Sequence, residues 1–101
     1  MKLTIKEVLK VAVISTGHLK QEEAAHLESC QVDGLILKIK DQYQYFISCS
    51  ASLIQEHPDE FLKLVSPRIL ELLKSFAESG FHAVMFDCDG LQVPELDYFE
   101  W

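Results

Sequence analysis

Two short polar clusters, one near each end of the 101-residue chain, contain side-chain types that carry out acid–base and metal chemistry. The first is Ser15-Thr16-Gly17-His18, which places two hydroxyls and an imidazole in four consecutive residues. Near neutral pH the imidazole of His18 can take a proton from the hydroxyl of Ser15 or Thr16, so these three are catalytic candidates. A structural role explains the same residues equally: a hydroxyl caps a helix, Gly17 makes the turn and His18 is exposed.

The second cluster is Asp87-Cys88-Asp89-Gly90. Carboxylates one residue apart can hold a hard cation such as Mg²⁺, which makes Asp87 and Asp89 metal candidates. Asp87 is also a catalytic candidate, because a carboxylate can attack phosphorus or a carbonyl carbon. The alternative is a turn in which the aspartate side chains accept hydrogen bonds from nearby backbone N–H groups. Apart from this Mg²⁺ site, the sequence contains no cofactor motif.

Residues 84–90 resemble the first motif of the haloacid-dehalogenase-type phosphohydrolases, an apolar strand followed by D-x-D-G. Leu91, however, stands where that family usually has threonine. The motif also lies near the C-terminus instead of the N-terminus, and the eleven residues after it are too few for the family's later lysine and acidic motifs. The resemblance is therefore confined to one short motif.

An apolar strand precedes each cluster. Residues 11–14 and residues 83–86 are continuous apolar runs, a pattern that predicts strands covered on both faces. After the first cluster, residues 20–29 are predicted to form a surface helix with two glutamates in its first turn. The capping-box pattern Thr4-Ile5-Lys6-Glu7 predicts a short helix over residues 4–9, and an extended arm fits this segment almost as well.

The middle of the chain is predicted to form a hairpin and a helical region. Alternating apolar residues indicate strands over residues 35–39 and 43–48, which follow an Asp33-Gly34 turn and are joined through residues 40–42. Pro58 opens a helical stretch that ends at Gly80.

These elements predict an α+β fold, a four-stranded mixed sheet with helices packed on it in the order (α)-β-α-β-β-α-α-β-tail, with a ferredoxin-like split βαβ fold as the alternative. Ser66-Pro67 decides how the last strand runs. Ser66 suits an N-cap and Pro67 a first helical residue, so we expect two helices with a reversal between them. The last strand then runs parallel to the first, and both polar clusters lie on the same side of the sheet.

Composition restricts the function classes. With 49% hydrophobic and 25% charged residues, the chain is expected to be one globular domain over residues 1–101. A net charge of −7 disfavours binding to nucleic acid, and the absence of a long apolar run argues against a membrane span. Three cysteines without a C-x-x-C pair, Cys30, Cys49 and Cys88, favour a reducing, cytoplasmic setting.

The C-terminal tail, residues 90–101, combines acids with aromatic residues. We expect it to pack on the domain, because aromatic side chains are costly to leave in water; the alternative is an acidic-aromatic plug for a basic partner. The hairpin carries further aromatic residues that suit contact with the tail or with a second copy in a homodimer. The candidate interaction residues are Tyr43, Tyr45, Tyr98, Phe99 and Trp101.

The two ends of the chain together resemble a family of short, uncharacterised bacterial proteins, a domain of unknown function. The family has an S-T-x-H segment after its first strand and ends in D-x-D-G followed by a leucine, an aromatic residue, an acid and tryptophan; the corresponding segments here are residues 15–18 and 87–101. The resemblance implies a stand-alone bacterial, cytoplasmic domain and assigns no reaction.

The leading functional hypothesis is a small, non-enzymatic module that binds a protein partner or a second copy of itself. The alternative is a metal-assisted hydrolase or phosphotransferase in which Asp87 and Asp89 hold Mg²⁺, Ser15 or Thr16 binds substrate or attacks it, and His18 moves protons.

Overall fold

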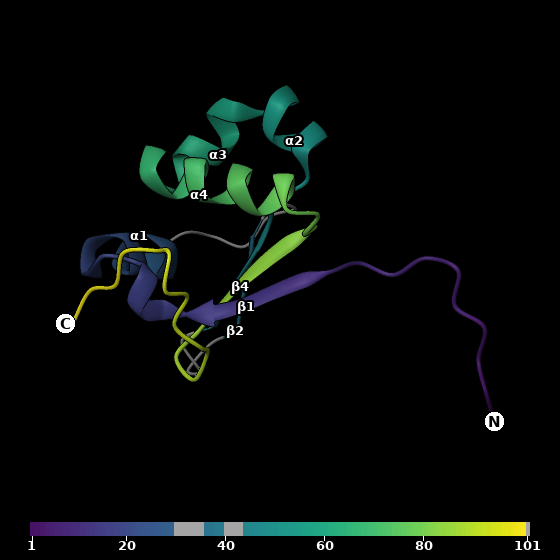
Figure 1. The fold of residues 1–101 in the computed structure, drawn as a ribbon. Coiled ribbons are helices and arrows are strands. Elements are labelled where there is room, and N and C mark those ends of the chain that lie inside the picture. Colours follow the sequence, from purple (N-terminus) through teal and green to yellow (C-terminus); the bar gives the residue numbers. More distant parts are fainter. Residues whose placement is uncertain (30–35, 40–43, 101) are drawn as a thin grey trace.

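The computed structural model describes residues 1–29, 36–39 and 44–100 (Figure 1). Several predictions fall outside these ranges: the turn at Asp33-Gly34, the hairpin connection at 40–42 and the roles of Cys30, Tyr43 and Trp101. Within the described ranges, every helix is too short or too polar to cross a membrane.

The described strands form one mixed sheet in the order β1-β4-β3-β2. Strand β1 (Val11–Ser15) lies at one edge and pairs in parallel with β4 (Ala83–Asp87). Strand β3 (Gln44–Ser48) pairs antiparallel with β4 on one side and with β2 (Ile36–Ile39) on the other. Because β1 and β4 are parallel neighbours, their carboxyl ends, and with them both polar clusters, lie side by side.

Four helices in the described part of the chain pack on one face of this sheet (Figure 1). A 3-10 turn, η1 (Thr16–His18), follows β1 and leads into α1 (Gln21–Ser29). The helices α2 (Ala51–Glu56), α3 (Pro58–Leu64) and α4 (Pro67–Glu78) lie between β3 and β4. Alternate residues of the strands face these helices and form the core with them, among them Ile14, Tyr45, Ile47, Val84 and Phe86.

The reversal at Ser66 is confirmed. Ser66 has extended backbone angles (φ −68°, ψ 161°), and its hydroxyl accepts a hydrogen bond of 3.2 Å from the N–H of Ile69. Pro67 occupies the first turn of α4, where its missing N–H costs nothing. The chain therefore changes direction before α4, and β4 enters the sheet parallel to β1 as the Ser66-Pro67 pair predicts.

The predicted fold class is wrong in its element order, and the observed α+β fold corrects it. Residues 1–10 form no helix: they are extended and exposed, so a short helix there would bury no apolar face to stabilise it. Three helices stand where two were predicted, because α2 buries only Ile54 and leaves a weak pattern in the sequence. The ferredoxin-like alternative is wrong as well, because β1 lies at the edge of the sheet instead of in its centre.

Candidate functional site

The two polar clusters meet at the carboxyl edge of β1 and β4. Ser15, the last residue of β1, is paired in register with Asp87, the last residue of β4. The turn after β4 then passes over the end of β1, and the N–H of Ser15 donates a 3.0 Å hydrogen bond to the carbonyl of Leu91. Gly90 is required here, since a Cβ at this position would lie 2.5 Å from the backbone carbon and oxygen of Ile14. The sequence clusters are therefore brought together by backbone pairing.

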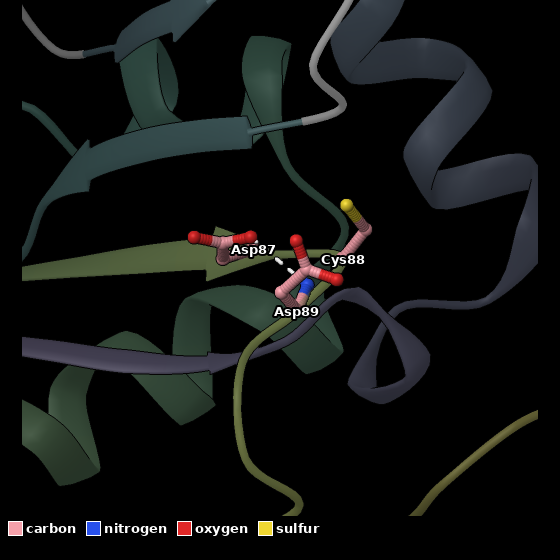
Figure 2. A group of neighbouring side chains, drawn as sticks. All are labelled: Asp87, Cys88 and Asp89. Carbon is pink, nitrogen blue, oxygen red and sulfur yellow. Dashed lines mark hydrogen bonds between the residues drawn. The ribbon is translucent and has the colours of Figure 1, made fainter.

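Asp87, Cys88 and Asp89 form a compact group at this edge (Figure 2). One ligand atom from each lies within 4.8 Å of the others, which is close enough for a shared divalent cation. Asp87 is half-buried and both of its oxygens accept hydrogen bonds, one from the N–H of Asp89 and one from the side-chain amide of Gln44, each 2.9 Å long. The carboxylate thus closes a turn and also faces solvent beside Asp89.

His18 is completely buried and has a structural environment. Its Nε2 accepts a 2.9 Å hydrogen bond from the N–H of Val93, so its Nδ1 carries the proton and donates it to the carbonyl oxygen of Asp97, 2.7 Å away. Both ring nitrogens are therefore used by the backbone of the tail. In this arrangement neither nitrogen faces Asp87 or a hydroxyl, and the predicted proton-transfer geometry is not formed.

Ser15 and Thr16 lie apart from the His18 ring. The buried hydroxyl of Ser15 accepts a 3.0 Å hydrogen bond from the N–H of Gly17 and so caps η1. A hollow of about 290 Å³ beside it is lined by residues that include Ser15, Thr16 and Cys88. His18 lines a different hollow, beside Arg68 and α4. The hydroxyls and Cys88 of the second cluster share one hollow, and the imidazole lines the other.

The tail, residues 91–100, closes over η1. The N–H of Phe99 donates a 2.7 Å hydrogen bond to the carbonyl of Gly17. The ring of Tyr98 packs edge-on against His18, with ring centroids 5.6 Å apart. The guanidinium of Arg68 lies over the ring of Phe99, 5.0 Å from its centroid. These contacts use the aromatic side chains of the tail to seal the carboxyl edge.

A partly buried ion pair between α1 and α4 supports this closure. Glu23 of α1, 9% exposed, accepts hydrogen bonds of 2.5 Å from the guanidinium of Arg68 and from the hydroxyl of Ser66. Arg68 also donates to the carbonyl of His18 at 2.8 Å. Burial raises the pKa of Glu23, but the hydrogen bonds from Arg68, Ser66 and the Lys20 N–H, with the charge of Arg68, outweigh it and hold the pKa below its ordinary value of 4.5.

Two of the predicted interaction residues take different positions. Tyr45 faces the core, is 2% exposed and donates its hydroxyl to Glu28 at 2.7 Å, so it is not a surface residue. Tyr98 is 44% exposed and Phe99 is half-buried in the sealed edge. Tyr43 and Trp101 lie outside the described residues.

A surface that the sequence analysis missed lies on the sheet face opposite the helices. The register places Val13 beside Met85 and Met85 beside Phe46, which makes one apolar row across three strands. Val13 is 50% exposed and Val11 36%, while Met85 and Phe46 are half-buried. The prediction that residues 11–14 are covered on both faces is therefore wrong. The signal in the sequence was the alternation in residues 44–48, which indicates a sheet with one open face.

Residues 1–10, the N-terminal arm, extend from β1 away from the domain (Figure 1). All ten residues are exposed, including Leu3, Ile5, Val8 and Leu9 at 65–72%. Among the residues that the structure describes, none forms a hydrogen bond with residues 1–9. The arm thus leaves a second set of apolar side chains in water.

Comparison with curated proteins and with solved structures found no match. The family model described as "Family of unknown function (DUF5983) C-terminal domain" matches residues 11–101 and so spans all the strands and helices described above. The chain therefore belongs to this family of unknown function.

Proposed function

We propose that this domain is a protein-binding module and that its docking surface is the open sheet face, defined by Val11, Val13, Phe46 and Met85. One observation carries the proposal: an apolar row crosses three adjacent strands on the face that no core residue of the described ranges covers. Contiguous apolar surface that remains in water on a folded domain is typical of sites that bind proteins.

The composition of this row supports a protein partner. Aromatic and methionine side chains are enriched at protein interfaces, and charged residues are depleted at their centres. Met85 adapts its shape to a partner and Phe46 supplies a rigid apolar ring. The net charge of −7 disfavours nucleic acid as the occupant.

A bacterial, cytoplasmic setting is part of the proposal. The Cys49 thiol is buried and donates a hydrogen bond to the carbonyl of Phe81, and burial raises its pKa. Such a thiol is inert and suits a reducing compartment. The likeness of the chain ends to short bacterial proteins supports the origin.

Site-specific photo-cross-linking tests the docking surface. A photoreactive phenylalanine analogue replaces Val13 or Phe46, and Leu62, an apolar residue of α3 that is 44% exposed, provides the matched control. Irradiation of the purified chain and of the cells from which it derives is expected to link positions 13 and 46 to protein, either a second copy or another chain. Equal or lower adduct yields at positions 13 and 46 than at position 62 would contradict the proposal.

A second candidate function is divalent-cation binding at Asp87, Cys88 and Asp89, in support of a metal-assisted hydrolase or phosphotransferase. The 4.8 Å grouping of their ligand atoms favours it, and Thr16 lies in the adjoining hollow as a substrate contact. If the site binds Mg²⁺ or Mn²⁺, either cation raises the melting temperature of the wild type and not that of Asp89→Asn. Equal shifts for both proteins, or none for either, reject the site.

A further inference from the structure

We propose that the groove between α2 and α4 is a second interaction surface and that its occupant is the N-terminal arm of another copy of this chain. The arm lies in the groove as an extended segment, with its apolar side chains inside and its lysines at the rim, and two copies exchange arms. This inference goes beyond the proposed function, because the groove lies among the helices and the open sheet face lies on the opposite side of the sheet.

The groove is a hollow of about 460 Å³ between α2 and α4, closed at one side by the start of α3. Most of its lining is small or apolar, including Ala51, Ile54, Pro58 and Ala77. Lys74 and Glu78 of α4 supply its charged side chains, and Lys74 donates a 3.1 Å hydrogen bond to Glu71 that offsets its charge. Such a concave, mainly apolar surface suits aliphatic side chains of an occupant.

The arm has an apolar side and a basic side when it is extended. The apolar residues fall mostly at odd positions and the lysines at even positions: Met1, Leu3, Ile5 and Leu9 on one side, Lys2, Lys6 and Lys10 on the other. Glu7 and Val8 are the exceptions to this alternation. An extended arm therefore buries Leu3 and Ile5, now 71% and 65% exposed, while its lysines stay at the surface.

The charges of the arm and of the domain are complementary. Residues 1–10 hold three of the nine basic residues and one of the sixteen acidic residues, so residues 11–101 hold six basic and fifteen acidic residues. Glu78 lies in the groove itself, and the exposed acids Glu56 and Asp59 are sequence neighbours of its lining residues Gln55 and Pro58. These carboxylates favour a basic occupant, and the arm is the basic segment of this acidic chain.

The backbone directs the arm away from the groove of its own copy. The N–H of Lys10 donates a 2.9 Å hydrogen bond to Nδ1 of His82, and the carbonyl of Lys10 accepts a 2.8 Å bond from the N–H of His82. A return to its own groove needs a tight turn just before Lys10, and residues 6–9 contain no glycine, asparagine, aspartate or proline. The arm accordingly extends away from the domain (Figure 1), where only another copy offers this groove.

The groove and the first residues of β1 lie at the same end of the sheet. His82, which holds Lys10, also accepts a 3.0 Å hydrogen bond from the N–H of Cys49. Helix α2 begins at Ala51, directly after Cys49, and α4 ends at Glu78, shortly before His82. When two copies face each other with this end across a two-fold axis, each arm meets the groove of the other copy. The two arm contacts then reinforce each other in one closed dimer.

Photo-cross-linking between distinguishable copies tests the placement of the arm. A photoreactive phenylalanine analogue replaces Ile5, and this chain is mixed with an excess of isotopically labelled wild type. Mass spectrometry is expected to find position 5 linked to residues 51–58 or 74–78 of the labelled copy. The analogue at Leu62, an exposed residue of α3 outside the groove lining, is the control and should give no adduct there. Adducts only within one copy, adducts only outside the groove, or no adducts overturn the inference.

Sedimentation velocity of the full chain measures the association. At about 100 µM, above the micromolar Kd of a modest interface, the wild type is expected to have twice its 11.5 kDa mass. Leu3→Lys/Ile5→Lys in the arm and Ala77→Lys in the groove should each weaken the dimer at least about tenfold, since each puts charge into an apolar contact. Leu62→Lys should change the Kd less than about twofold. Because the arm is exposed, the arm variant keeps its fold, and thermal melting checks Ala77→Lys.

The two proposed surfaces can fail separately. Val13→Lys, on the open sheet face, should change the Kd of the dimer less than about twofold. A dimer that is lost in Val13→Lys but survives the arm and groove variants overturns the arm exchange. A wild type that stays monomeric at about 100 µM while positions 13 and 46 link to a different protein also overturns it and leaves the proposed function standing. A dimer that depends on the arm and the groove, without adducts at positions 13 and 46, supports the exchange and removes the open sheet face as a docking surface.

Discussion

The two ends of strand β1 are built in opposite ways. At the carboxyl end, η1 and residues 91–100 enclose Ser15 and His18, and backbone groups of the tail use both nitrogens of the imidazole. At the amino end the arm is fully exposed, and Val11 and Val13 leave an apolar face open.

This arrangement is the opposite of what the residue types suggest, which is that catalytic side chains are open to solvent and aliphatic side chains are buried. The residues with catalytic potential lie at the sealed end, where His18 acts as a buried link between η1 and the tail. The plain aliphatic residues lie at the open end, where nothing in the described chain covers them. Reactive side chains therefore stabilise one end, and aliphatic side chains form an exposed apolar surface at the other.

The largest expected effect is at the sealed end, at Gly90. A Cβ there would lie 2.5 Å from the Ile14 backbone, which cannot move aside as a side chain can. We expect Gly90→Ala to lower the free energy of unfolding by about 3 kcal/mol in urea titrations. Gly80→Ala is the control: it has a positive φ of 92° and open space around it, so it should lose about 1 kcal/mol. Equal losses would mean that the edge is less tightly packed than described.

The next effect compares two histidines that each accept a backbone N–H, one at each end of β1. His18 is buried and accepts from Val93; His82 is exposed and accepts from Lys10 at 2.9 Å. His18→Leu leaves two partly buried backbone groups, the Val93 N–H and the Asp97 carbonyl, without their partner and should cost about 2–3 kcal/mol, whereas water replaces His82 and its loss should cost under about 1 kcal/mol. Urea unfolding measures both, and a smaller cost at His18 would break the contrast between the ends.

Glu23 makes the sealed end sensitive to acid. Its folded-state pKa lies below the ordinary 4.5, so its contribution is complete above that pH and is lost as the pH falls through the lower folded value. Glu23→Gln should therefore cost about 2 kcal/mol at pH 7 and progressively less below pH 4.5. Chemical unfolding at a series of pH values measures the difference, with Glu71→Gln, an exposed residue, as the control. A difference that stays constant with pH would show that Glu23 is not ionised in the folded state.

The smallest expected effect is at the open end. Ile5→Lys should change the free energy of unfolding by less than about 0.5 kcal/mol, because Ile5 is 65% exposed on the extended arm. Urea titration at high dilution measures this change. A clear loss at high dilution would mean that the arm packs on its own domain.

Much of the fold could be predicted from local patterns. The reversal at Ser66-Pro67 follows from the backbone limits of proline and from a hydroxyl that accepts an N–H three residues on, so the parallel alignment of β1 with β4 was predictable. The prediction of a helix over residues 4–9 also rested on a local pattern, and it was wrong. A capping box does not stabilise a helix that has no surface to pack on.

The sequence by itself determined most of the strands and helices and the side of the sheet on which the two polar clusters lie, because capping, turn and alternation depend on residues a few positions apart. Only the tertiary structure decided which side chains are enclosed by hydrogen-bond partners and which remain exposed to solvent. The partners of His18 lie 75 and 79 residues along the chain, and the exposure of Val13 depends on which face of the sheet the helices cover. Burial is a property of neighbours that are distant in sequence, and no local pattern specifies those neighbours.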